Sequence, residues 1–396
     1  MTSSFPAARK HHVLLVALAY IAFISLGLPD GLNSVAWPSI RAEFGLPLDA
    51  LGALITMSTI GYLASSFSSG RILARTGVGW LLAASCLVTA VSLLGYGMSP
   101  AWAVMVGLGL LAGLGAGAID SGLNTYAADE FSPSMMNWLH AFYGLGAATG
   151  PILMSSIIAA GWGWRPGYMI VGAAQVVLAL CFIATRTMWQ IHHEDGTPAG
   201  PAAPSATMLA TLSLPKTWLS ILMFFLYTGL EVCAGQWTYT LLTESRGIAP
   251  SVAGAWVSGY WGCLTVGRLL SGAVVTRLSV QTMLRGCMAL SLLSAALIWL
   301  NLAPWVTMVA IGLLGLALAP MFPSLIALTP ARMGPEHSAN TVGFQIAAAA
   351  AGGALLASSF GFLARNFGLE LLGPFLLVVG VVMTVVFLTL ERGRRG

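Results

Sequence analysis

Charged residues are scarce in this chain. Only 8% of its 396 residues are Asp, Glu, Lys or Arg, whereas a soluble domain normally carries about 25%. Apolar residues make up 57% and the mean hydropathy is +0.85, so the chain lacks the side chains that a water-exposed surface needs. The composition excludes a soluble globular protein and predicts an all-α integral membrane protein.

The chain also lacks the residue clusters that enzymes and metal sites use. It contains no HExxH, GxSxG or Walker motif and no clustered His and Cys, so we expect no enzyme, no metal and no bound cofactor. No basic, aromatic-rich stretch suggests a nucleic-acid partner. The cysteines all fall in predicted spans without CxxC spacing, as packing residues do: Cys86, Cys181, Cys233, Cys263 and Cys287.

Hydrophobic runs close to the ~20 residues that cross a bilayer recur along the whole chain. The first run begins just after Arg9 and Lys10, but it is too long for a signal peptide and is taken as a retained span. In total the runs predict twelve spans, at 12–37, 49–71, 78–98, 102–127, 137–160, 167–187, 216–241, 251–276, 282–301, 304–328, 339–364 and 370–390.

Lys and Arg are distributed unevenly over the predicted loops. With the N-terminus inside, twelve of them lie on the inner side and four on the outer side. Loops rich in Lys and Arg stay in the cytoplasm. Both termini are therefore expected to face the cytoplasm.

A polar stretch rich in Pro, Ala and Gly separates the first six spans from the last six. We expect an N-terminal six-helix bundle (1–189), a cytoplasmic linker (190–214) and a C-terminal six-helix bundle (215–396). A shift of 202 positions places Arg75 on Arg277 and several glycines on glycines. The two halves are therefore predicted to be pseudo-symmetric repeats.

Acidic residues inside the predicted spans are the strongest functional signal. A charged side chain at the bilayer centre costs at least ~2.5–3.5 kcal/mol and usually has a function. Asp30, Asp120 and Glu231 lie in such positions. Burial favours the neutral form of a carboxyl group, which suits a site that takes up protons. Asp30 and Asp120 are expected on the order of 15 Å apart along the membrane normal, so they form no direct pair.

Two further titratable residues belong to this set. His140 is expected near Asp120, either as a proton shuttle or as a polar residue at a helix end. Arg268 lies inside the eighth predicted span and needs a partner, for which Glu231 and Asp30 are the candidates. If the pair is purely structural, neither of its members has a role in transport.

One face of the first span carries three candidate residues. Asp30, Asn33 and Trp37 follow the spacing i, i+3, i+7, which places an acid, an amide and an aromatic ring on one helix face. The flanking Pro29 and Gly31 leave a broken helix as an alternative, and Trp37 could equally be an interfacial anchor.

The other candidate solute contacts are amide and aromatic side chains within the spans, which suit hydroxyl groups and sugar rings. They are Asn124, Tyr143, Gln236, Trp237, Tyr260, Trp261 and Gln345.

Residues 70–77 (GRILARTG) resemble a weakened form of the signature between helices 2 and 3 of the major facilitator superfamily (MFS), with Ala74 where that superfamily has an acid. The chain resembles an MFS transporter over essentially its whole length. The resemblance implies the MFS fold, with 12 transmembrane helices in two six-helix halves. The residues expected to serve as structural or gating charges are Arg71, Arg75, Arg268 and Arg277.

Within the superfamily the chain is similar to the fucose permease-like sugar:proton symporter group. The similarity rests on residues 113–115 (GLG) followed by Asp120 and Asn124, and on residues 137–142 (NWLHAF), in which His140 replaces a glutamine of the group. It implies proton-coupled uptake of a sugar.

We therefore expect a secondary active transporter of a bacterial inner membrane that works by alternating access. Proton binding at Asp30, Asp120, His140 or Glu231 would drive the uptake of a sugar or polyol. The proton is the expected coupling ion, a small solute and membrane lipids are the expected partners, and the protein is expected to be a monomer. A proton-coupled exporter of drugs or hydrophobic metabolites is the main alternative, and a receptor that binds without translocation is another.

Overall fold

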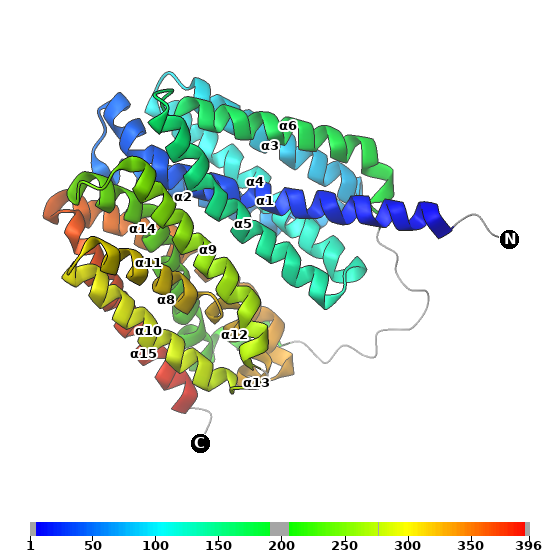
Figure 1. Cartoon of the computed structure of the whole chain (residues 1–396). Coiled ribbons are helices and arrows are strands. Elements are labelled where there is room, and N and C mark those ends of the chain that lie inside the picture. Colours follow the sequence, from blue (N-terminus) through cyan, green and yellow to red (C-terminus); the bar gives the residue numbers. More distant parts are fainter. Residues whose placement is uncertain (1–4, 191–205, 276, 393–396) are drawn as a thin grey trace. The chain divides into compact units, whose positions relative to one another are not determined.

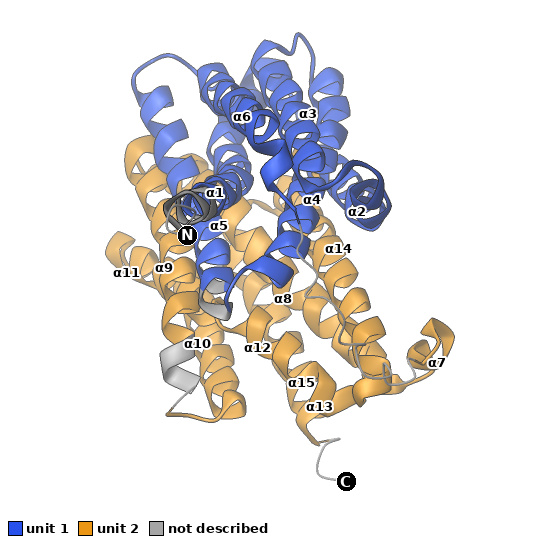
Figure 2. Cartoon of the chain, turned by 90° about the vertical axis from the view of Figure 1, so that its right-hand side faces the viewer, with its two compact units in different colours: residues 1–46, 53–193 blue, residues 47–52, 194–396 orange. Residues whose placement is uncertain are grey.

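The structure, a computed structural model, describes residues 5–190, 206–275 and 277–392. Within these residues all regular structure is helical. The chain divides into two compact units, residues 1–46 with 53–193 (unit 1) and residues 47–52 with 194–396 (unit 2) (Figure 2). The predicted limits of the two halves stay predictions, and much of the predicted linker lies outside the described residues.

The helices of unit 1 are long and joined by short loops (Figure 1). They are α1 (Phe5–Phe44), α2 (Leu51–Thr76), α3 (Val78–Met98), α4 (Trp102–Glu130), α5 (Pro133–Ala159) and α6 (Arg165–Thr185), followed by the 3₁₀ turn η2 (Arg186–Met188). A further 3₁₀ turn, η1 (Leu48–Ala50), groups with unit 2.

Unit 2 contains shorter helices as well as long ones (Figure 1). They are α7 (Met208–Leu212), α8 (Pro215–Thr240) with the π-helical turn η3 (Leu241–Ser245), α9 (Pro250–Val275), α10 (Val280–Leu300), α11 (Pro304–Leu318), α12 (Met321–Ala327), α13 (Thr329–Met333), α14 (Pro335–Phe367), the 3₁₀ turn η4 (Leu369–Leu371) and α15 (Leu372–Arg392).

Eleven helical segments of the described chain are long and apolar enough to cross a membrane. They coincide with eleven of the twelve predicted spans, and the remaining one, predicted at 251–276, forms α9, which carries Arg268. The protein is therefore a multi-pass membrane protein with an all-α fold. The tenth predicted span is broken, since α11 ends at Leu318 and α12 begins at Met321.

The two units repeat the same helix pairing. In unit 1, α1 packs against α5, and α3 packs against α4 and α6. In unit 2, the corresponding α8 packs against α14, and α10 packs against α11 and α15. This shared pairing supports the two-fold repeat that the glycine and arginine spacing predicts.

Helix α1 is continuous, so the alternative of a helix broken at Pro29 is wrong. It runs for 40 residues through Pro29 and Pro38. It lies so close to α5 that a Cβ added to Gly27 would be 2.1 Å from the carbonyl oxygen of Tyr143. Such close packing against a neighbouring helix compensates for the hydrogen bonds that prolines remove in a membrane helix.

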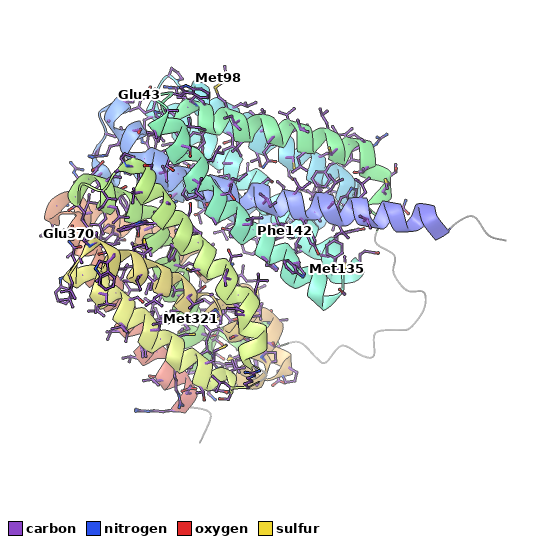
Figure 3. The ribbon with its side chains drawn as sticks, viewed as in Figure 1. Glu43, Met98, Met135, Phe142, Met321 and Glu370 are labelled. Atoms are coloured by element: carbon purple, nitrogen blue, oxygen red, sulfur yellow. The ribbon has the colours of Figure 1, made fainter. Side chains whose placement is uncertain are left out.

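An arginine ties three helices together at one end of unit 1. Arg165 lies 2.7 Å from Glu43 near the end of α1, measured between Nη2 and Oε1. It also donates to the carbonyl oxygens of Gly97 and Ser99 at the end of α3. Figure 3 shows Glu43 and Met98 together at this end, away from Phe142 on α5.

Unit 2 contains the same arrangement with the charges exchanged. Arg246 follows the first long helix of this unit, and its Nη2 lies 2.7 Å from Oε2 of Glu370, just before the last helix. Its guanidinium also donates to the carbonyl oxygen of Ile298 and to the hydroxyl of Thr307. The acid thus stands on the first helix in unit 1 and before the last helix in unit 2. Alignment by residue identity cannot detect this equivalence.

We predict that Arg246→Ala lowers the free energy of unfolding by about 1–3 kcal/mol, because it removes charge-assisted hydrogen bonds to partners on three elements. The Arg246 side chain is only 7% exposed, so water does not replace these bonds easily. The measurement is the thermal unfolding midpoint in detergent. Arg75→Ala, at the exposed end of α2, is the control, and an equal effect of both changes would contradict the prediction.

Candidate functional site

Asp30 lies at the packed contact between α1 and α5. The hydroxyl of Tyr143 donates a hydrogen bond to Oδ2 of Asp30 at 2.6 Å, and both side chains are half-buried. The close approach of the two helices at Gly27 brings the tyrosine within reach. A carboxyl group inside a span thus has a hydrogen-bond donor from another helix.

Asp120 is held in a similar way between α2 and α4. The hydroxyl of Tyr62 donates to its Oδ2 at 2.5 Å, and Nδ2 of Asn124 donates to its Oδ1 at 2.9 Å. The glycines before Asp120 allow this contact: a Cβ on Gly113 would lie 1.8 Å from the carbonyl oxygen of Ser58. The predicted i, i+4 relation of Asp120 and Asn124 is therefore a direct contact.

These two carboxyl groups belong to one polar cluster that involves four helices. Tyr62 interacts electrostatically with Asp30 as well as with Asp120. His140 on α5 interacts electrostatically with Asp120, and its ring lies with its edge toward Phe23, 5.5 Å between centroids. The arrangement can hold a proton at either acid and offers hydroxyl and imidazole groups between them.

The other two residues on the predicted face of α1 have different neighbours. Asn33 accepts a hydrogen bond of 2.7 Å from Tyr168 on α6. Trp37 is fully buried, with its ring 5.5 Å from that of Trp102 on α4. Full burial excludes the interfacial anchor for Trp37. Solute contact by Asn33 and Trp37 stays a prediction.

Glu231 is the partner of Arg268 in unit 2, one of the two partners that the sequence suggests. Its Oε1 lies 3.5 Å from Nη2 of Arg268. The hydroxyl of Tyr227 contacts Oε2, and the hydroxyl of Tyr260 donates to the backbone carbonyl of Glu231 at 2.9 Å. Glu231 is 8% exposed, so these groups replace water around a buried charge.

Besides Tyr260, two more of the candidate solute contacts in unit 2 form hydrogen bonds between helices. The amide of Gln345 bonds to the hydroxyls of Ser220 and Thr329, and the residue is 1% exposed. Nε1 of Trp237 donates to the carbonyl oxygen of Ala357 at 2.8 Å. A solute would have to compete with these bonds.

Two other candidates in unit 2 have buried polar atoms with no hydrogen-bond partner in the described chain, namely Oε1 of Gln236 and Nε1 of Trp261, and in unit 1 the same holds for Nε1 of Trp37. A buried polar atom of this kind gains free energy from a ligand hydroxyl group. Gln236 and Trp261 are therefore the solute contacts that the geometry of unit 2 favours.

Three of the four predicted structural or gating arginines lie at the surface, and the fourth, Arg268, is the partner of Glu231. Arg71 and Arg75 are exposed on the last turns of α2, and Arg277 is exposed in the turn before α10. Within the described residues no group of three or more His, Cys, Asp or Glu side chains is placed to hold a metal ion.

The sequence analysis missed Tyr62. It lies 58 positions from Asp120, and nothing in the second predicted span distinguishes it from a packing aromatic residue. Tyr227 is four positions from Glu231, and this helical spacing places both on one helix face, where their side chains are in contact.

Two matching six-helix halves with carboxyl groups inside their spans define a secondary transporter rather than a membrane enzyme. The family model of the Major Facilitator Superfamily matches residues 19–355. The chain belongs to this superfamily.

Curated relatives are distant but cover most of the chain. Bypass of stop codon protein 6 of Saccharomyces cerevisiae is 24% identical, over 90% of this chain and 78% of the relative. The glucose/mannose transporter GlcP of Bacillus subtilis is 22% identical, over 87% and 86%. The probable sulfoacetate transporter SauU of Cupriavidus necator is 24% identical, over 74% and 72%.

Solved structures share the fold. A bacterial homologue of the human lysosomal transporter Spinster gives a TM-score of 0.75 at 14% identity, covering 99% of this chain and 98% of that one. The transporter FucP gives 0.63 at 15% identity, covering 97% and 99%. At these identities the likeness shows the fold alone.

We predict that Gly113→Ala separates α4 from α2 and lowers the free energy of unfolding by about 1–3 kcal/mol, the usual effect of overpacking. The added methyl group would meet backbone atoms of Ser58, which cannot rotate away. Gly107→Ala on the same helix meets no atom within 4 Å and is the matched control. Thermal unfolding of both variants tests this, and equal midpoints would disprove the close contact.

Proposed function

We propose that this transporter couples proton movement to the uptake of a small polar solute, a sugar or polyol, by alternating access. It acts as a monomer in the inner membrane of a bacterium, with both termini in the cytoplasm. The proton is the coupling ion, and no bound cofactor takes part. The observation that carries the proposal is the pair of half-buried carboxyl groups, Asp30 and Asp120, each bonded to a tyrosine hydroxyl.

The chemistry of this cluster supports proton coupling. A phenol hydroxyl donates to an ionised carboxylate and accepts from a protonated one, so both states of each acid have a partner without water. His140 interacts electrostatically with Asp120 and adds an imidazole group that can pass a proton to or from the acid. The cluster thus tolerates the loading and release of a proton that symport requires.

Two observations support a sugar or polyol as the solute. One is the relative named for glucose and mannose transport. The other is the unpaired Oε1 of Gln236, which accepts a hydrogen bond from a hydroxyl group but not from a carboxylate.

The coupling test uses the protein in proteoliposomes with D-glucose, D-mannose and L-fucose under an inward proton gradient. We predict that Asp120→Asn abolishes accumulation but preserves counterflow, because exchange of solute on the two sides requires no net release of a proton. Asp30→Asn tests the second acid in the same way.

Asp129→Asn is the matched control, since Asp129 is an exposed acid on the same helix as Asp120. It should accumulate solute as the unchanged protein does. Accumulation that persists in both Asp30→Asn and Asp120→Asn would overturn proton coupling through this cluster.

Solute identity is measured by thermal shift against a solute library at two pH values. A specific ligand stabilises the folded protein by an amount that depends on its concentration relative to its dissociation constant. We expect one sugar or polyol to raise the unfolding temperature and Asp30→Asn or Asp120→Asn to reduce that rise. Stabilisation by bulky hydrophobic cations alone would instead identify an exporter.

A further inference from the structure

The break in the tenth span lies at a contact of three helices in unit 2. Between α11 and α12 the chain passes through Ala319 and Pro320. A Cβ on Gly267 of α9 would lie 2.5 Å from Cβ of Ala319. The neighbouring Met321 is fully buried and is labelled within unit 2 in Figure 3. The break is therefore packed directly against the turn of α9 that carries Arg268.

Tyr227 on α8 reaches this break and Glu231 with the same oxygen atom. Its hydroxyl contacts Oε2 of Glu231 and lies 3.2 Å from the carbonyl oxygen of Leu318, the last residue of α11. Its ring packs against Phe322 in the first turn of α12, 6.1 Å between centroids. One side chain thus connects a buried acid to both sides of the helix break.

A phenol hydroxyl has a single proton, so it cannot donate fully to both acceptors. When Glu231 is ionised, it can only accept, and Tyr227 donates to it; the carbonyl of Leu318 then has no donor from Tyr227. When Glu231 is protonated, it donates to the oxygen of Tyr227, whose own proton is free to point at Leu318. The protonation state of Glu231 therefore decides whether α8 is hydrogen-bonded to the break.

We propose that Glu231, Tyr227 and the carbonyl of Leu318 form a proton-operated switch, the Tyr227 switch, that fastens the α11–α12 break to α8. Uptake of one proton by Oε2 of Glu231 turns the hydroxyl of Tyr227 toward Leu318, and release of that proton turns it back. The proton comes from water and returns to water. Only hydrogen bonds change.

One charged group faces both Glu231 and Tyr227. The guanidinium of Arg268 interacts with both side chains, and its Nη2 lies 3.5 Å from Oε1 of Glu231, farther than the 2.7 Å and 3.2 Å of the ion pairs that Arg165 and Arg365 form. Tyr260 bonds only to the backbone of Glu231. The helices α14 and α15 also pack against α8, and in their described residues no titratable side chain bonds to Glu231. Among the described residues, Arg268 is thus the charged side chain that contacts Glu231.

The inference rests on the proposed function, because it adds a second proton site that acts on a helix break. The switch itself is measurable without solute or transport. Hydrogen–deuterium exchange of the purified full-length protein follows the amides of residues 316–328 at an acidic and an alkaline pH. Rates are corrected for the intrinsic effect of pH and compared with peptides of α3.

In the unchanged protein we expect the amides of residues 316–328 to exchange about fivefold more slowly at acidic pH, the ratio that one net hydrogen bond supplies. In Tyr227→Phe these amides should exchange fast at both pH values, since the phenyl ring has no hydroxyl. Glu231→Gln should exchange slowly at both, because its amide donates as the protonated acid does. Tyr260→Phe, which also removes a hydroxyl bond to Glu231, is the matched control and should keep the pH dependence.

Equal protection at both pH values in the unchanged protein would overturn the switch, and so would a pH dependence that survives in Tyr227→Phe. If Glu231→Gln does not fold beside the charge of Arg268, the neutral pair Glu231→Gln with Arg268→Gln replaces it. If Asp120→Asn accumulates solute as the unchanged protein does, while the amides of residues 316–328 keep their pH-dependent protection, the proposed function is refuted. The switch is then still supported.

Discussion

Inside a bilayer no water is available to bond a buried polar group, so each such group needs a partner from the protein. The acids Asp30, Asp120 and Glu231 all meet this requirement with a tyrosine hydroxyl. Two of these tyrosines come from a different helix than the acid. The acids therefore depend on accurate helix packing, and the packing depends on glycines that let backbones touch.

Each unit contains an arginine–glutamate ion pair that joins three of its helices, but the two residues occupy different helices in the two units. In each, an arginine joins the first helix, the last helix and the end of the third helix, yet Arg165 and Arg246 stand on different members of the set. An ion pair functions equally well in either direction, so the geometry persists when the charges are exchanged. Repeat detection by residue identity finds the shared glycines and misses this equivalence.

Some polar side chains of the spans have fixed hydrogen bonds, and others can change their partner. Gln345 and Trp237 belong to the first kind, because they bond to groups on neighbouring helices of unit 2. Tyr227 instead has two acceptors for one proton. The protonation state of Glu231 decides which of the two acceptors that proton reaches, so Tyr227 is suited to respond to a proton.

The sequence by itself determined the class of protein, eleven of its spans and which acids lie within them, because composition and hydropathy act locally along the chain. It also placed Asn124 beside Asp120, since their spacing is one helical turn. Only the tertiary structure decided that Tyr62 bonds Asp120 and Tyr143 bonds Asp30, over separations of 58 and 113 positions. These contacts depend on which helix faces touch, and helix-face contacts are not set by local periodicity.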